Sequence, residues 1–214
     1  PSIAAMGTRE RLYLTNTRAS KRFYLLSTRK APVASAFRER VDLTNRMDWH
    51  NAYSYPNPIV GAKPDLTSGF AFVTQPLDTT VDVSGFDGEI HAIINKRDMD
   101  IGLVLYEMRP DGKLMELSYY LGRASYARDM SVRTLLTPGK ASVIRFDRSF
   151  LFSRRVAKGS RLLLAVDVNV NPFAQVNYGT GKDVSIEDVH DAGSPLDIQW
   201  LTSSYIGIRT QAVL

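Results

Sequence analysis

The sequence has 214 residues, 44% of them hydrophobic, and no cysteine. At about 150 residues per domain, this length favours one large domain with a self-sufficient apolar core. The lack of cysteine excludes disulfides, thiolate metal sites and a cysteine nucleophile, and it leaves the compartment open. The sequence contains no run of about 18 apolar residues that would cross a membrane. A single domain built around its own core is therefore expected.

The charge is concentrated at the N-terminal end of the chain. Overall, 27 Lys and Arg residues against 22 Asp and Glu residues give a net charge of +5. Residues 1–40 hold nine basic and two acidic residues, a net of +7, so the other 174 residues carry 18 minus 20, or −2. The first residues form no secretory signal. With its first methionine at Met6, the chain is expected to be a piece of a longer one.

Short apolar runs that alternate with polar residues recur between turn residues, and helical periodicity is nearly absent. This pattern predicts an all-β domain. The stretch Ala34–Val41 fits two helical turns or a strand equally well, and residues 48–69 and 171–194 are expected to be long surface connections. In chain order, the expected strands are Arg11–Asn16, Arg22–Ser27, Phe70–Thr74, Thr80–Ser84, Glu89–Asn95, Ile101–Arg109, Leu114–Leu121, Ser142–Asp147, Arg161–Asn169, Leu196–Leu201 and Tyr205–Thr210.

Turn chemistry supports this reading. Pro110 and the Asp-Gly pair that ends at Gly112 lie between two apolar runs, which is a hairpin signal, because proline presets φ and glycine accepts positive φ. Asp87-Gly88 is expected to interrupt the chain in the same way. About eleven strands in one domain predict a jelly-roll sandwich of two antiparallel sheets.

A search for catalytic motifs finds little. The Gly-x-Ser-x-Gly elbow of α/β serine hydrolases is absent. The Gly179–Lys182 segment lacks the earlier glycine and the following Ser or Thr of a phosphate-binding loop. His190 lies between Asp188 and Asp191, which leaves a metal-dependent enzyme as a weak third hypothesis, although the sequence offers no second ligand cluster. We therefore expect no catalytic residue, no metal and no cofactor.

Aromatic residues suggest a second hypothesis. Exposed aromatic rings on a β-sandwich can stack on sugars, so Trp49, Tyr53 and Tyr55, like Trp200, are weak ligand candidates for a stand-alone carbohydrate-binding module. Core packing explains most aromatic residues more simply. The basic N-terminal segment also contains Tyr13, as a nucleic-acid stripe would, but the rest of the chain is acidic and carries no nucleic-acid motif.

Several turn motifs follow one another in a fixed order. They are Tyr53-Ser-Tyr-Pro-Asn-Pro58, Thr74-Gln-Pro-Leu77, Val83-Ser-Gly85, Asp98-Met-Asp100, Arg109-Pro-Asp-Gly112, Leu121-Gly-Arg123 with Arg128, Gly159-Ser-Arg-Leu-Leu-Leu164, Asn177-Tyr-Gly-Thr-Gly181 and Ser203-Ser-Tyr-Ile-Gly-Ile208. This order resembles the C-terminal domain of the X-Pro dipeptidyl-peptidase and cocaine-esterase (CocE/NonD) family of α/β serine hydrolases. Two departures are the single Gly61, where the family often has Gly-Gly, and Pro172-Phe173, which inverts the usual order.

The resemblance implies one galactose-binding-like jelly roll over residues 1–214, with residues 1–15 as the exit from a preceding catalytic domain. Such domains pack against an α/β-hydrolase domain that holds a Ser-Asp-His triad, and no triad motif matches this sequence. The implied function is therefore a non-catalytic domain that helps shape the substrate cleft of a serine hydrolase. Its implied partner is the catalytic domain of the same chain, with homo-oligomer contacts also open and no nucleic acid or membrane.

The charge distribution adds one expectation about that partner. The +7 segment lies where the chain would leave its catalytic domain. Arginine pairs with carboxylates through its planar fork of donors. We therefore expect several basic residues to meet carboxylates, of the catalytic domain or of this one, and take as interdomain contact candidates Arg9, Arg11, Arg18, Arg22 and Arg29.

Overall fold

The computed structural model describes residues 9–31, 33–45, 60–64, 66, 68–147, 149–170 and 175–213. These residues form strands and short 3-10 turns, with no α-helix among them. The strands are β1 (Glu10–Arg18), β2 (Tyr24–Ser27), β3 (Ala36–Val41), β4 (Val60–Gly61), β5 (Phe70–Val73), β6 (Val81–Ile94), β7 (Asp100–Met108), β8 (Leu114–Arg123), β9 (Ala141–Phe146), β10 (Arg154–Val156), β11 (Arg161–Val168), β12 (Leu196–Leu201) and β13 (Tyr205–Ala212). The 3-10 turns are η2 (Ala124–Tyr126), η3 (Val184–Ile186) and η4 (Val189–Ala192).

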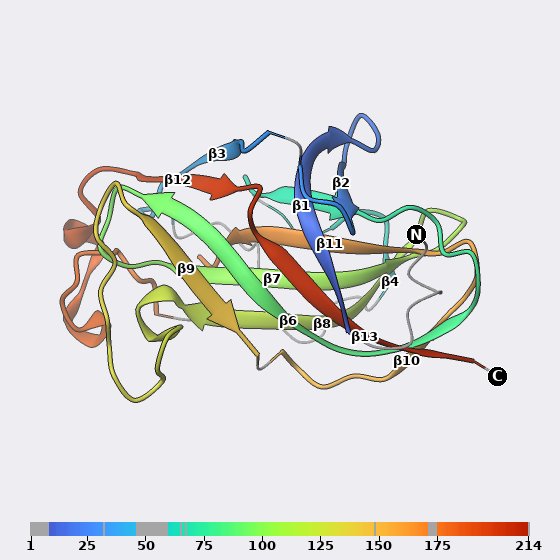
Figure 1. Ribbon diagram of the computed structural model, residues 1–214. Helices are drawn as coiled ribbons and strands as arrows, with labels where there is room; N and C mark the ends of the chain where they lie inside the picture. The colour runs from blue at the N-terminus through green and yellow to red at the C-terminus, as the bar shows by residue number, and fades with distance from the viewer. Residues whose placement is uncertain are drawn as a thin grey trace.

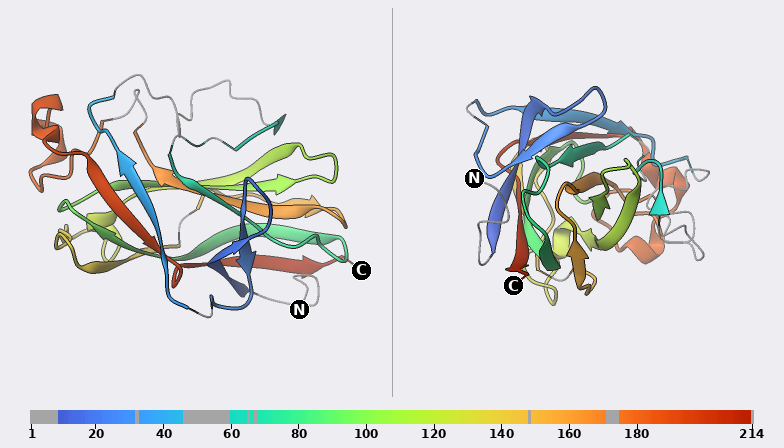
Figure 2. Two further views of the ribbon diagram at one scale, coloured as in Figure 1. Left: turned by 90° about the horizontal axis from the view of Figure 1, so that it is seen from above. Right: turned by 90° about the vertical axis from the view of Figure 1, so that its right-hand side faces the viewer.

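The strands lie in two facing layers (Figures 1 and 2). One layer follows the path β3-β12-β6-β13-β1. The long strand β6 pairs along one edge with β12 and β13 in turn, and along its other edge with β9 and β10. The other layer has the order β2-β5-β11-β7-β8-β4. The antiparallel β1-β2 hairpin joins the layers into one hydrogen-bonded path. The expected all-β sandwich is confirmed, and the structure adds that β2 and β5 are parallel.

A large apolar core fills the space between the layers. Its largest fully buried side chains include Trp200 of β12 and Phe72 of β5. A second apolar cluster covers the other face of β5, β11 and β7, and includes Val73, Val104 and Leu163. Side chains on both faces of β7 and β11 are therefore buried, which explains why the sequences of these strands are nearly continuous apolar runs.

The structure settles the ambiguous segment and corrects one boundary. Ala36–Val41 is a strand, with alternate residues buried against β12. The expected turn at Asp87-Gly88 is wrong, because Val81–Ile94 is one strand that passes straight through it. Gly88 is required there for space, since a Cβ atom at this position would lie 2.3 Å from the carbonyl oxygen of Tyr205. The short strands β4 and β10 carry too little alternation to be predicted.

Candidate functional site

The sequence-derived ligand candidates do not assemble into a site among the described residues. His190 is exposed in η4, where its backbone N–H donates to Asp188 Oδ1 at 2.8 Å. Asp191 binds Lys182 Nζ at 2.5 Å and accepts from the backbone N–H of Asp188. Both carboxylates thus close the turn. In the described part of the chain, no group of three metal-ligating side chains is present.

The aromatic candidates give no sugar platform that the structure describes. Trp49, Tyr53 and Tyr55 lie outside the described residues. Trp200 is completely buried, and its indole N–H donates to Glu39 Oε2 at 2.6 Å. A ring enclosed on both faces cannot stack on a ligand. Trp200 therefore belongs to the core.

His91 makes a serine-histidine-glutamate contact on the outer face of β6. Its Nδ1 lies 2.7 Å from Ser203 Oγ, and its Nε2 lies 3.3 Å from Glu89 Oε2. Arg145 donates to the other oxygen of Glu89 at 3.1 Å. Burial raises the pKa of Glu89, but the hydrogen bonds from His91 and Arg145 outweigh it and lower the pKa overall. The contacts tie β6 to β9 and to the β12–β13 turn.

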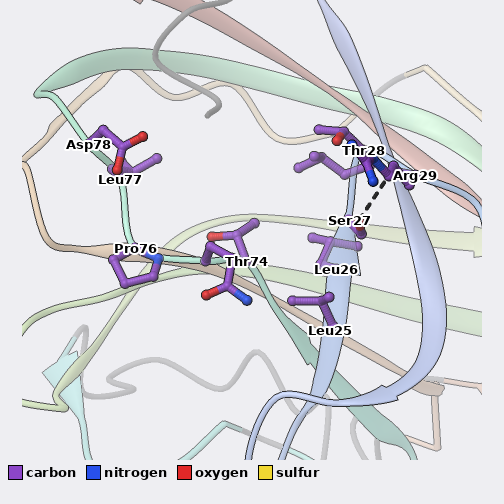
Figure 3. A pocket seen from close by; sticks show the side chains of 11 residues that line it. Leu25, Leu26, Ser27, Thr28, Arg29, Thr74, Pro76, Leu77 and Asp78 are labelled. Atoms are coloured by element: carbon purple, nitrogen blue, oxygen red, sulfur yellow. Dashed lines mark hydrogen bonds between the residues drawn. The ribbon is translucent and has the colours of Figure 1, made fainter. Parts of the chain in front are cut away.

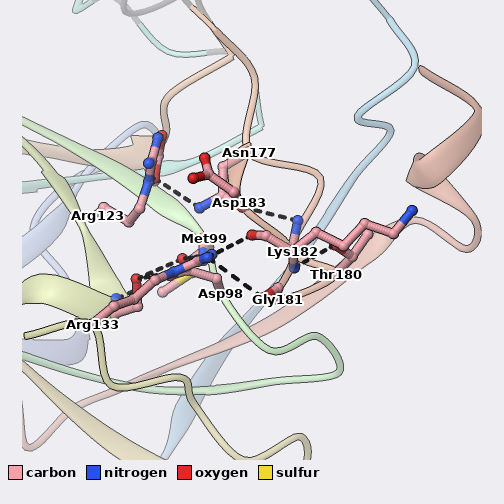
Figure 4. Close-up of polar contacts among 12 residues, drawn as sticks. Asp98, Met99, Arg123, Arg133, Asn177, Thr180, Gly181, Lys182 and Asp183 are labelled. Carbon is pink, nitrogen blue, oxygen red and sulfur yellow. Dashed lines mark hydrogen bonds and ion pairs between the residues drawn. The ribbon is translucent and has the colours of Figure 1, made fainter. Parts of the chain in front are cut away.

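Asp98 is the centre of a buried ion cluster (Figure 4). Its Oδ1 accepts from the backbone N–H groups of Met99 at 3.0 Å and Ser125 at 2.9 Å. Its Oδ2 accepts from Ser125 Oγ at 2.6 Å and from Arg133 Nη2 at 3.1 Å. A buried carboxylate is tolerated only when it is paired in this way.

A second pair extends this cluster. Arg123 donates to both oxygens of Asp100, at 2.9 and 3.0 Å, and this hydrogen bonding raises the pKa of Arg123. Asn177 Nδ2 also donates to Asp100, at 2.9 Å. Arg133 reaches the carbonyl oxygen of Lys182 at 2.5 Å (Figure 4). The loop after β11 is thereby fixed against the loop before β7.

The buried ion cluster explains part of the motif order seen in the sequence. Asp98-Met-Asp100, Leu121-Gly-Arg123 and Asn177–Gly181 meet in this one place. The motifs therefore report a structural cluster. Sequence reasoning missed Ser125 and Arg133, because neither has a local pattern that relates it to Asp98.

The Thr74–Leu77 motif forms part of one wall of an open cleft of about 360 Å³, and backbone hydrogen bonds connect it to the Gly159–Leu164 motif. The backbone N–H of Thr74 donates to Leu162 O at 2.9 Å, and that of Leu77 donates to Ser160 O at 2.8 Å. Figure 3 shows the segment Thr74–Asp78 facing Leu25–Arg29 at the end of β2. No acid-base pair of side chains among its described lining residues suggests a catalytic role. The cleft places Arg29 at its margin.

The interdomain contact candidates are all exposed, and they differ in their partners. Arg9 Nε donates to Asp87 Oδ1 of β6 at 3.0 Å, so it meets a carboxylate of this domain. Arg11 stacks on the Tyr205 ring, 4.5 Å from its centroid, and Arg18 stacks on the Tyr24 ring at 3.9 Å. Among the residues the structure describes, no carboxylate is bonded to Arg11, Arg18, Arg22 or Arg29.

Comparison with known proteins gives the family. A family model described as the X-Pro dipeptidyl-peptidase C-terminal non-catalytic domain matches residues 5–193. A search of curated protein sequences found no match. In the described part of the chain, no helix is long and apolar enough to span a bilayer.

Solved structures share the fold at low sequence identity. An alpha-amino acid ester hydrolase labelled with selenomethionine is 16% identical with a TM-score of 0.72, over 95% of this chain and 36% of that chain. An aminopeptidase from a marine sediment Thaumarchaeota archaeon is 16% identical with a TM-score of 0.73, over 95% of this chain and 37% of that chain. A CocE/NonD family hydrolase from Staphylococcus aureus is 11% identical with a TM-score of 0.61, over 96% of this chain and 37% of that chain.

These findings define an all-β domain whose fold recurs as one part of larger hydrolase chains. The chain belongs to the family of X-Pro dipeptidyl-peptidase C-terminal non-catalytic domains. It spans little more than a third of the length of the solved chains that it resembles.

Proposed function

We propose that this chain is the non-catalytic C-terminal jelly roll of a serine hydrolase, which packs on an α/β-hydrolase domain and helps shape its substrate cleft. The observation that carries the proposal is the family match over residues 5–193. The parent enzyme would transfer an acyl group from a peptide, amide or ester to water through a serine acyl-enzyme. Two structural neighbours, an ester hydrolase and an aminopeptidase, are in keeping with that range of substrates.

The basic N-terminal strands supply the proposed contact surface. Of the five candidate arginines, Arg9 is committed to Asp87, whereas Arg18 and Arg22 have no bonded carboxylate among the described residues. Charged groups at the edge of an interface fix its register and speed association. The proposal assigns this role to Arg11, Arg18, Arg22 and Arg29.

Turnover by the purified 214-residue chain tests the non-catalytic role. Aminoacyl-proline and simple ester substrates are offered to this chain and, in parallel, to the parent protein. We expect hydrolysis by the parent alone. Hydrolysis by the 214-residue chain that a serine-directed inhibitor abolishes would overturn the proposal. A glycan titration followed by tryptophan fluorescence is the control for the carbohydrate-binding hypothesis, and we expect no saturable response.

A further inference from the structure

Three cations surround one small cleft next to the β1-β2 hairpin. The cleft has a volume of about 320 Å³ and lies between that hairpin, the segment after β4 and the start of β5. Its cations are Arg18, Arg22 and Lys63. The other lining residues are apolar, aromatic or glycine: Phe23, Tyr24, Pro64, Leu66, Gly69, Phe70 and Ala71. None of the described lining residues is acidic.

The hairpin holds two of these cations in place. The backbone N–H groups of Ala19 and Ser20 donate to Phe23 O at 3.0 and 3.1 Å, and Ser20 Oγ accepts from the N–H of Arg22 at 3.2 Å. The Arg18 guanidinium lies over the Tyr24 ring. This tight turn presents Arg18 and Arg22 from its two ends. Neither guanidinium is paired with a carboxylate among the described residues.

The opposite wall of the cleft lies close to the sheet at Gly69. A Cβ atom on Gly69 would lie 2.1 Å from Val166 O and 2.8 Å from Cγ of Asp167. Asp167 is 2% exposed, and its Oδ1 accepts from the backbone N–H of Val168 at 2.8 Å. Asp167 is therefore buried beside this wall and does not line the cleft. Among the described lining residues, the charged groups of the cleft are therefore all cations.

This arrangement suits an anion with two acceptor oxygens. Like charges around one cleft repel each other, and an anion placed among them removes the repulsion. Arginine guanidinium groups match carboxylates with two parallel hydrogen bonds, and stacking on an aromatic ring restricts the guanidinium beforehand.

We propose that Arg18, Arg22 and Lys63 form a carboxylate-binding cleft that receives acidic side chains of the catalytic domain. This inference rests on the proposed function. The similar solved chains have more than 60% of their length outside the part that this chain matches, so a partner surface of ample size is expected. Such pairing supplies the carboxylates that these cations lack within the described chain.

Neutralising the three cations tests the assigned partner. The variant R18Q/R22Q/K63Q is compared with R38Q/K113Q/K158Q, which removes three exposed cations elsewhere and changes the net charge equally. The 214-residue chain and the preceding part of the parent are produced separately, and their dissociation constant is measured at low salt. We expect about a tenfold or greater weakening for the first variant and less than about threefold for the control. Circular dichroism confirms that both variants are folded.

A small dicarboxylate tests the cleft itself. Succinate is compared with sodium chloride at equal ionic strength for its effect on the thermal midpoint of the 214-residue chain. We expect succinate to raise the midpoint of the wild type and of the control variant, and not that of R18Q/R22Q/K63Q. Equal midpoints in both salts would overturn the cleft. A succinate effect with an unchanged dissociation constant would overturn the catalytic domain as its partner, and absence of any association would overturn the proposed function.

Discussion

The buried ion cluster and the basic hairpin, which is the β1-β2 hairpin with Arg18 and Arg22, differ in how their charged groups are paired. Asp98 is completely buried and accepts four hydrogen bonds from groups of its own domain. Arg18 is exposed and lies over a tyrosine ring, and no carboxylate among the described residues reaches it. Charges that fix the fold are satisfied internally. The exposed charge of Arg18 remains available to the catalytic domain that we propose as its partner.

The largest effect is expected from Asp98→Ala. The substitution leaves the Arg133 guanidinium and two backbone N–H groups without their acceptor in a buried place. Breaking a buried pair on one side costs about 3–5 kcal/mol. Denaturant unfolding of the 214-residue chain measures the loss. Asp82→Ala, which breaks the exposed pair with Arg155, is the matched control and should change the midpoint little; a similar loss from both variants would contradict the contrast.

Arg123→Gln is expected to have the next largest effect on stability. It removes a two-bond pair with Asp100, while Asn177 still donates to that carboxylate. Hydrogen bonds to charged groups contribute about 1.5–3 kcal/mol, and partial exposure of Arg123 favours the lower part of that range. The same unfolding assay reports the change. A loss as large as that of Asp98→Ala would contradict this ranking.

The smallest effect concerns the pH dependence of stability at Asp191. Its pKa is lowered, first by the hydrogen bond from Lys182 and then by the backbone N–H of Asp188. A carboxyl group whose pKa is lower in the folded state stabilises the fold above its unfolded pKa, near 4, and this contribution disappears as the pH falls through the folded pKa. Unfolding midpoints of wild type and Asp191→Asn should therefore differ at neutral pH and converge in acid. A difference that is constant with pH would contradict this origin.

The sequence predicts the architecture better than the polar contacts. The apolar run at Arg161–Asn169 predicts β11 almost to the residue, because the pattern of one strand is local. The Asp98–Arg133 and Asp100–Asn177 contacts join residues 35 and 77 positions apart, so no periodicity relates them. The order of the motifs indicated the family, but only the fold shows that three of the motifs meet in one cluster. The acidic neighbours of His190 suggest a metal site in the sequence, but in the structure their oxygens accept hydrogen bonds from backbone N–H groups of their own turn.

The most direct test of the contrast is thiol labelling of the basic hairpin. The chain has no cysteine, so Lys21→Cys on the exposed turn and Ile186→Cys on η3, where Ile186 is 70% exposed, each introduce one reporter. Labelling rates are compared between the 214-residue chain and the parent protein. We expect labelling at Lys21→Cys to be at least about tenfold slower in the parent and labelling at Ile186→Cys to be unchanged, because thiol reactivity follows access. Equal rates at Lys21→Cys in both proteins would contradict this expectation.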